Sequence, residues 1–164
     1  MDSATLELLV DALPKIFIAG VTVTLPLALV SFAIALVIAT AVALVQYARV
    51  PVLRQVARFY IWVVRGTPLF VQLYIVFFGL PDLGITLDPL PTAILVLSIN
   101  TGAYSAETMR GALESVPAGQ VEAGYCVGMS YLQVMRRIVL PQALRTAFPP
   151  LSNELISLVK DTSL

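Results

Sequence analysis

The sequence has little of what a soluble enzyme uses. Its 164 residues include no histidine and a single cysteine, Cys126. The lack of histidine excludes a Ser-His-Asp or Cys-His nucleophile and any His-based metal site, and one cysteine excludes a disulfide framework within the chain. No stretch matches the phosphate-binding pattern G-x-x-x-x-G-K-[ST]. We therefore expect no enzymatic activity, no cofactor and no metal on this chain.

Charge is also scarce. Only 12% of the residues are charged and the net charge is zero, whereas a soluble domain has about 25% charged residues. A neutral chain gives no basis for binding nucleic acid. Because 59% of the residues are hydrophobic and the mean hydropathy is +0.91, the composition predicts a membrane protein. The N-terminal residues include acids (Asp2, Glu7 and Asp11) rather than the basic start of a signal peptide, so we expect a retained first span.

The apolar stretches predict an all-α, multi-span helical bundle. Between Lys15 and Arg49 lie 33 uncharged residues, about 50 Å of helix, which exceeds the ~30 Å hydrocarbon core of a bilayer. We expect this helix to tilt or to bend at Pro26. Further apolar stretches follow, and Arg65 is expected to snorkel toward the interface. A single transmembrane domain over residues 1–164 is predicted, with spans at about 16–46, 60–80, 89–107 and 145–164.

A ridge of small residues runs along the first predicted span at every fourth position: Ser31, Ala35, Ala39 and Ala43. Such a ridge lets a second helix approach closely, although alanine that simply faces lipid would give the same pattern. We expect packing against another helix.

The basic residues indicate the orientation. The second predicted connection holds Asp82 and Asp88 and no base, whereas the first and third connections are rich in arginine: Arg49, Arg54, Arg58 and Arg65 in the first, and Arg110, Arg136, Arg137 and Arg145 in the third. Basic loops stay on the cytoplasmic side. The first and third connections are therefore predicted inside, and the N-terminus and the second connection outside.

The stretch "VEAGYCVGMSYLQVMRRIVLPQA" predicts a helix–turn–helix at the cytoplasmic side. Pro117 can begin a first short helix, and Gly128 suits a left-handed helix stop. Ser130 with Gln133 forms a capping-box pattern that opens a second helix. Pro141 is expected to end or bend that helix before the chain re-enters the membrane.

The second helix of this hairpin is predicted to be two-sided. Gln133, Arg136 and Arg137 are expected to face away from an apolar stripe at i, i+3, i+4 and i+7: Tyr131, Val134, Met135 and Ile138. The small residues Ala123 and Gly124 in the first helix would allow a partner to approach closely. Three roles remain open from the residues alone, namely docking of a partner protein, an amphipathic helix lying on lipid, and simple linkage between spans.

These residues resemble the EAA motif of permease subunits of bacterial ABC importers. Gly124 replaces the usual second alanine, and the matching residues are Glu122, Ala123, Gly128, Leu140 and Pro141. Four further stretches resemble the polar amino-acid uptake branch, which is similar to the histidine and glutamine permeases: "GVTVTL" (20–25), "RGTPLFVQL" (65–73), "YSAETMRGALESVPAGQ" (104–120) and "KDTSL" (160–164). The family continues beyond this point, so we expect the chain to be truncated at its C-terminus.

The resemblance implies a type I importer in the bacterial cytoplasmic (inner) membrane. A cytoplasmic ABC ATPase dimer would hold ATP and Mg, a second permease chain, identical or homologous, would complete the path, and an extracytoplasmic binding protein would deliver a polar amino acid. The coupling region is predicted at 114–142, with these ATPase-coupling residues: Glu122, Ala123, Gly124, Gly128, Arg136, Leu140 and Pro141.

Polar residues within the last two predicted spans mark a candidate substrate path, because such groups face a cavity or a partner. They are Asn100, Thr101, Tyr104, Glu107, Asn153, Glu154, Ser157, Lys160 and Asp161. Local pairing is the alternative, since Glu107 can pair with Arg110 and Lys160 with Asp161, and polar groups also bridge helices. Gln72 is expected to make such a packing hydrogen bond.

The leading functional hypothesis is a non-enzymatic permease subunit that couples ATP hydrolysis by a partner to the uptake of polar amino acids. Two alternatives remain. The first is a self-sufficient small channel or secondary transporter, for which the expected inverted repeat is not evident. The second is a membrane scaffold whose hairpin recruits a cytoplasmic partner.

Overall fold

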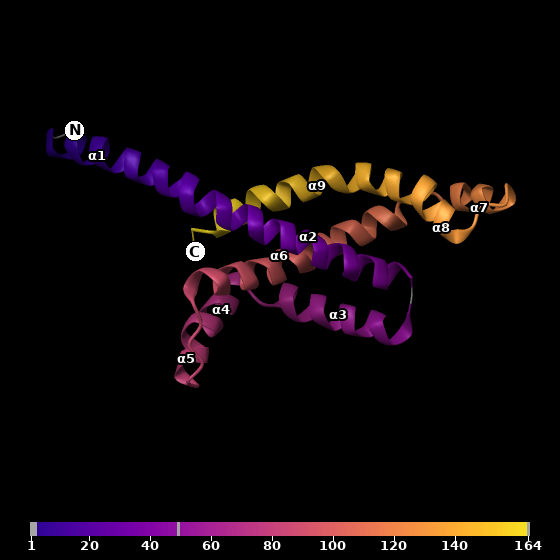
Figure 1. Ribbon diagram of the computed structural model, residues 1–164, viewed down its shortest axis with the longest axis horizontal. Coiled ribbons are helices and arrows are strands. Elements are labelled where there is room, and N and C mark those ends of the chain that lie inside the picture. Colours follow the sequence, from indigo (N-terminus) through magenta and orange to yellow (C-terminus); the bar gives the residue numbers. More distant parts are fainter. Residues whose placement is uncertain (1–2, 49, 164) are drawn as a thin grey trace.

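The structure, a computed structural model, describes residues 3–48 and 50–163, with side chains from residue 10 onward; Arg49 lies outside these ranges. Every regular element within them is helical, as the all-α prediction requires (Figure 1). In chain order the elements are α1 (Ser3–Ala19), η1 (Gly20–Thr24), α2 (Leu25–Tyr47), α3 (Pro51–Gly66), α4 (Leu69–Tyr74), η2 (Ile75–Gly79), α5 (Leu80–Asp82), α6 (Pro89–Glu114), α7 (Ala118–Cys126), α8 (Tyr131–Val134), η3 (Met135–Val139) and α9 (Leu140–Asp161).

Three π-helical turns each end two residues before a proline: η1 before Pro26, η2 before Pro81 and η3 before Pro141. In η3 the amide of Leu140 donates to the carbonyl of Met135, five residues back. Proline has no N–H, and its ring clashes with the carbonyl four residues earlier in an α-helix; the wider π turn accommodates it. Pro141 was expected to end or bend the second hairpin helix. It does not end it, because the helix continues through η3 into α9.

The stretch 60–80, expected as one span, is two helices that meet at 97° between Gly66 and Leu69. Thr67 is extended, with φ −118° and ψ 134°, because the ring of Pro68 disfavours helical backbone at the residue before it. The Gln72 amide then fixes the bend, donating to the carbonyls of Val64 at 2.8 Å and Thr67 at 3.0 Å. This confirms that Gln72 makes a packing hydrogen bond.

The small-residue ridge is the contact between α2 and α6. Ser31, Ala35 and Ala39 are completely buried and Ala43 is 1% exposed. On the facing helix, the Ser98 hydroxyl donates to the carbonyl of Ser31 at 3.1 Å. A Cβ atom on Gly102 would lie only 3.1 Å from Ile38 Cγ2, so glycine permits this close approach. The prediction that the ridge packs against another helix is confirmed.

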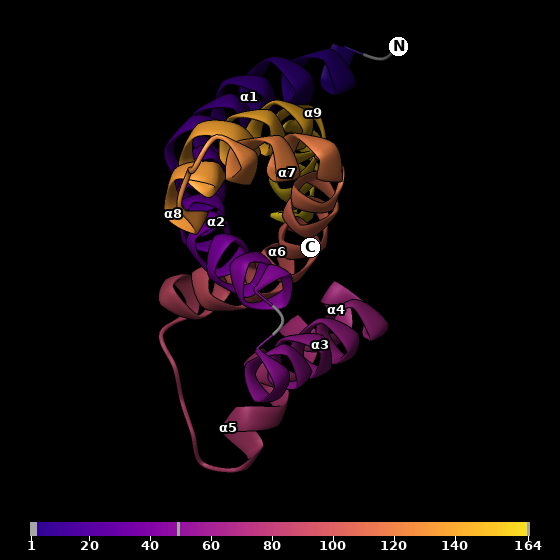
Figure 2. The same cartoon turned by 90° about the vertical axis from the view of Figure 1, so that its right-hand side faces the viewer.

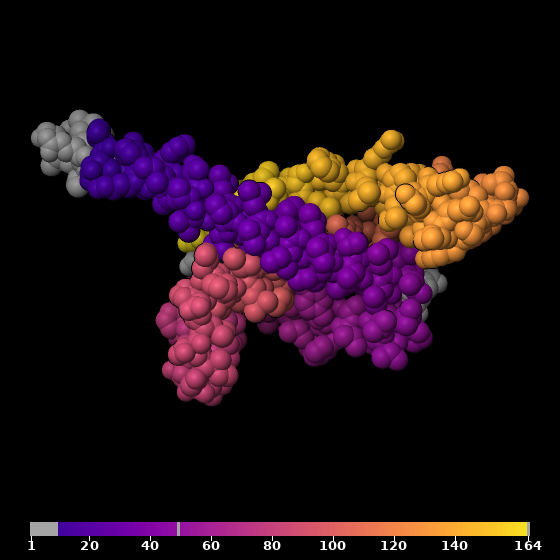
Figure 3. All heavy atoms as spheres, in the orientation of Figure 1, coloured from indigo at the N-terminus to yellow at the C-terminus, as the bar shows by residue number. Residues whose placement is uncertain are grey.

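Helix α6 packs against α2, α3 and α9 (Figure 2). Three clusters of buried apolar residues follow it, one near each end and one in the middle. Helix α1 and the α4–α5 segment project away from this bundle (Figure 3). These contacts of α6 matter below, because the same helix contributes to both candidate hollows and is followed in the chain by α7.

The helices alternate in direction, so that the α2–α3 connection and the α7–α8 hairpin lie at one end and the α5–α6 loop and both termini toward the other (Figure 1). Within the described ranges, Val10–Tyr47 is long and apolar enough to cross a membrane, and the bent pair Pro51–Gly66 and Leu69–Asp82 qualifies if it counts as one span. Helices α6 and α9 contain too many polar residues to meet the same criterion. That they cross a membrane stays a prediction.

Candidate functional site

The turn between α7 and α8 is built by local sequence. Helix α7 follows Pro117 and ends at Cys126, and Gly128, two residues later, has the left-handed conformation predicted for it, with a φ of +77°. The amides of Gly128 and Met129 donate to the carbonyls of Tyr125 (2.9 Å) and Gly124 (3.0 Å), which completes a Schellman helix end. Helix α8 then opens with the predicted capping box between Ser130 and Gln133. This combination fixes the hairpin.

Gly124 faces the inside of the hairpin. A Cβ atom there would lie 2.9 Å from Ile138 Cδ1 and 3.0 Å from Val134 Cγ2. The close approach that Gly124 allows is thus made by this chain's own second helix, whereas the sequence suggested approach by a partner. Ala123, the neighbouring residue, is exposed and leaves that surface accessible.

The apolar stripe of the second helix is shifted from the predicted one. Val134, Met135 and Val139 are buried and Ile138 is partly buried, but Tyr131 is exposed. The π turn explains the difference, because it adds a residue to one turn and rotates the helix face that follows. Gln133, Arg136 and Arg137 are exposed, as predicted.

The tip of the hairpin presents an apolar surface to its surroundings. Val127 is 77% exposed and Leu132 is 73% exposed, with Tyr125 and Tyr131 beside them in the sequence and also exposed. Glu122 and Arg136 are exposed charged residues of the same hairpin, whereas Leu140 packs partly against the buried cluster at its base. Exposed apolar groups among charges are typical of a surface that binds a protein partner or a membrane.

A first hollow, of about 340 Å³, lies between α6 and α9. We call it the acidic hollow, and it is lined by Leu69, Asn100, Thr101, Tyr104, Glu154, Ser157, Leu158 and Asp161. Six of these belong to the nine residues predicted for a substrate path. Asn153 and Lys160 are exposed and do not line it, and Glu107 lies in the neighbouring hollow instead. The Asn100 amide donates to Gln72 Oε1 at 3.2 Å, which connects the hollow to the bend.

A second hollow, of about 590 Å³, lies between α3, α6 and the end of α2. We call it the basic hollow, and it is lined by Gln46, Arg54, Arg58, Ile61, Trp62, Arg65, Gly66, Tyr104, Glu107 and Arg110. Tyr104 lines both hollows. The Arg65 guanidinium lies over the Tyr104 ring, 5.0 Å from the centroid, and its expected reach toward the membrane interface stays a prediction.

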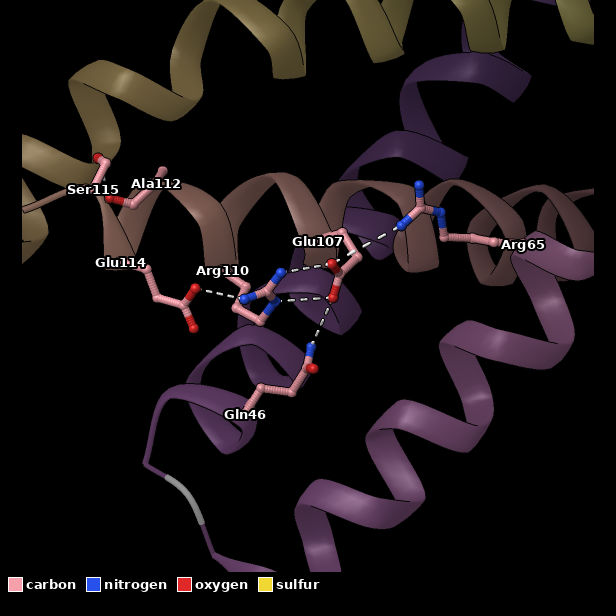
Figure 4. Close-up of polar contacts among 7 residues, drawn as sticks. All are labelled: Gln46, Arg65, Glu107, Arg110, Ala112, Glu114 and Ser115. Atoms are coloured by element: carbon pink, nitrogen blue, oxygen red, sulfur yellow. Dashed lines mark hydrogen bonds and ion pairs between the residues drawn. The ribbon is translucent and has the colours of Figure 1, made fainter.

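A polar network centred on Glu107 joins three helices at this hollow (Figure 4). Arg110 holds both carboxylate oxygens, at 3.0 and 2.9 Å, and its third nitrogen donates to Glu114 at 2.6 Å. The Gln46 amide donates to Glu107 at 3.4 Å, and Arg65 Nη1 lies 4.0 Å from the same carboxylate. The hydrogen bond with Glu107 raises the pKa of the Arg110 guanidinium, which stays protonated. The local pair of Glu107 with Arg110 is therefore real.

Four residues of the basic hollow carry no motif that marks them as a site in the sequence: Gln46, Arg54, Arg58 and Arg65. Arg54, Arg58 and Arg65 are spaced by four and seven residues, which places them on one helix face. That spacing could have marked them as a group, but they were assigned only to the orientation of the chain. Within the described ranges, no group of three or more His, Cys, Asp or Glu residues could hold a metal ion.

In a comparison with known protein families, residues 34–164 match the family described as "Binding-protein-dependent transport system inner membrane component". The chain is 47% identical over 145 residues to the L-cystine transport system permease protein TcyB of Bacillus subtilis (strain 168), covering 88% of this chain and 62% of that protein. It is 46% identical over 156 residues to the octopine transport system permease protein OccM of Rhizobium radiobacter, covering 90% and 64%. The chain thus spans less than two thirds of the length of these relatives.

Solved structures agree. The crystal structure of an amino acid ABC transporter with histidines matches with a TM-score of 0.87 and 33% sequence identity, over 99% of this chain and 74% of that one. An inward-facing structure of the MetNI methionine ABC transporter matches with a TM-score of 0.70 and 26% identity, over 98% and 74%. Both matches extend over the hairpin and the two hollows.

Proposed function

Since the chain belongs to the family of binding-protein-dependent transport system inner membrane components, we propose that it is the transmembrane permease subunit of an ATP-driven importer for polar amino acids. The match over residues 34–164 carries this proposal, because it includes the hairpin and both hollows. The named relatives transport L-cystine and octopine, and both substrates are polar amino-acid compounds. The subunit itself is not an enzyme, and ATP with Mg is bound by a separate ATPase chain.

The hairpin is the proposed coupling helix region, over residues 114–142, and it seats in a cleft of a cytoplasmic ATPase dimer. Its exposed apolar tip and its charged residues Glu122 and Arg136 support this role. The roles of the predicted coupling residues differ accordingly. Ala123 faces outward, Gly124 and Gly128 shape the hairpin, and Leu140 with Pro141 joins it to α9.

The acidic hollow is the proposed part of the substrate path on this chain. The carboxylates of Glu154 and Asp161 on α9 and the amide of Asn100 on α6 line it, and the carboxylates could bind the ammonium group of an amino acid. A second permease chain, identical or homologous, would complete the path, and an extracytoplasmic binding protein would deliver the substrate. In a bacterial inner membrane, the arginine-rich end with the hairpin faces the cytoplasm and the N-terminus faces outward.

The test uses the full-length gene product, purified in mild detergent with whatever proteins accompany it. A substitution at the hairpin tip, Leu132→Asp, should abolish the binding of an ATPase or its stimulated ATP hydrolysis. Leu132 is exposed and stands second in α8, where an acid favours the helix, so the change does not weaken the hairpin itself. Ile85→Asp, the same change at an exposed site of the opposite loop, is the matched control.

The two alternatives predict different outcomes. A chain that purifies alone and conducts solute in liposomes would support a self-sufficient channel or secondary transporter. Co-purification of a regulatory protein in place of an ATPase would support the scaffold. Full ATPase coupling in the Leu132→Asp variant would contradict docking through the hairpin tip.

A further inference from the structure

The two hollows carry opposite charge and share one lining residue, Tyr104. The acidic hollow contains Glu154 and Asp161 and no base, whereas the basic hollow contains four arginines and one acid, Glu107. The Tyr104 ring lies in the wall of both. A ligand next to this tyrosine would therefore experience negative charge on one side and positive charge on the other.

The positive charge of the basic hollow is only partly neutralised. Arg110 is engaged with Glu107 and with Glu114, and its bidentate bond neutralises Glu107 as well. Arg54, Arg58 and Arg65 remain on the α3 face that lines the hollow. The Nε atom of Arg54 is enclosed and has no hydrogen-bond partner within the described part of the chain. A guanidinium nitrogen that is removed from water without a partner is costly.

Arg65 is the arginine placed at the boundary between the hollows. Its guanidinium stacks on Tyr104 at 5.0 Å, and its Nη1 lies at the outer limit of an ion pair with Glu107, 4.0 Å away. A guanidinium that stacks with its face keeps the N–H groups on its edges available, and these match a carboxylate in bidentate geometry.

We propose that Arg65 binds the α-carboxylate of the transported amino acid while the ammonium group of the same molecule lies in the acidic hollow, with Arg54 and Arg58 adding positive potential. This inference rests on the proposed function and specifies the substrate class: a free, zwitterionic α-amino acid. A carboxylate is favoured over other anions because the opposite charges on the two sides of Tyr104 complement a zwitterion, and a phosphate would not use the acidic side.

The test measures binding to the full-length permease with its ATPase in phosphatidylcholine nanodiscs, without an extracytoplasmic binding protein, so that the binding protein's own preference plays no part. The probes are L-arginine, L-glutamine, L-histidine and L-cystine, each compared with its α-carboxamide. The amide removes the negative charge, and measurement at about pH 6 keeps its α-ammonium group protonated, because the pKa of an α-amino group next to an amide is about 7.7–8.0. The wild type should bind the acid form of its best probe about tenfold or more tightly than the amide, as expected for a charge-assisted bond.

In Arg65→Gln the acid form should lose about tenfold in affinity, and its advantage over the amide should shrink to within about threefold. The affinity for the amide should not change, and this serves as an internal check that the variant is folded. Arg65→Lys, which keeps the charge, should retain part of the preference. Arg145→Gln, which changes an exposed arginine that lines neither hollow, should behave as the wild type.

Unchanged preference for the acid form in Arg65→Gln would overturn the inference and leave the proposed function intact. If anionic phosphatidylglycerol in the nanodisc displaces the acid form and its amide equally, the hollow holds a lipid phosphate, and the inference is again wrong. If the wild-type complex binds none of the four amino acids, the proposed substrate path fails and the inference falls with it.

Discussion

The packing of Gly124 inside the hairpin leads to a prediction that opposes the family pattern, in which alanine is usual at this position. An added Cβ atom would lie 2.9 Å from Ile138 Cδ1 and 3.0 Å from Val134 Cγ2, well inside the ~3.5–4.0 Å optimum between carbon atoms. The Ile138 terminal methyl can rotate away, but Val134 is branched at Cβ and stiff. The cost of overpacking is about 1–3 kcal/mol.

Helix propensity offsets part of this cost, because alanine is favoured over glycine in a helix by about 1 kcal/mol. We therefore expect Gly124→Ala to destabilise the hairpin by about 1 kcal/mol. Hydrogen exchange of the Met129 amide, which donates to the Gly124 carbonyl, reports this opening. Its exchange should become about fivefold faster in the full-length complex.

Two further variants separate steric from helical effects. Gly119→Ala adds a methyl group to the same helix at a point with no other atom within 4 Å, so it should slow exchange. Ile138→Val removes the methyl group closest to the added Cβ, and Gly124→Ala should cost less in that background, which a double-mutant cycle measures. Slower exchange in Gly124→Ala alone, or no coupling with Ile138→Val, would refute the reasoning.

Two more predictions concern the bundle, and both use the unfolding free energy of the chain in mixed micelles. Ala39→Leu should destabilise the chain by about 1–3 kcal/mol, because it inserts bulk into the completely buried contact of α2 with α6. Val37→Leu, at a site that is 71% exposed, is the control and should have no effect. Equal effects of the two substitutions would contradict the packing role of the ridge. Gln72→Leu should destabilise by about 1–3 kcal/mol, because the carbonyls of Val64 and Thr67 and the Asn100 amide lose their partner. Gln55→Leu, on the exposed side of α3, is the control for this substitution. Equal unfolding free energies for the two variants would contradict the role of Gln72 at the bend.

The hairpin could be predicted from sequence because its determinants are local. Gly128 supplies a positive φ, and Ser130 and Gln133 cap each other three residues apart, so neighbouring residues alone settle the turn. The bend at Thr67 was less visible. Pro68 is a possible helix break, but the apolar run across it indicated a single straight span. Hydropathy gives the length of an apolar segment and not its path.

The basic hollow could not be predicted, because it depends on contacts between segments far apart in the sequence. Periodicity places Arg54, Arg58 and Arg65 on one face of α3 but does not say what that face meets. The rotation of α3 is set by Tyr60, whose hydroxyl donates to the Ile99 carbonyl at 2.6 Å beside Gly102. Gly102 in turn is needed for α2 to reach α6. The charge pattern at Tyr104 therefore arises only after three helices have packed, and any change that rotates α3 should alter the basic hollow while leaving the hairpin unchanged.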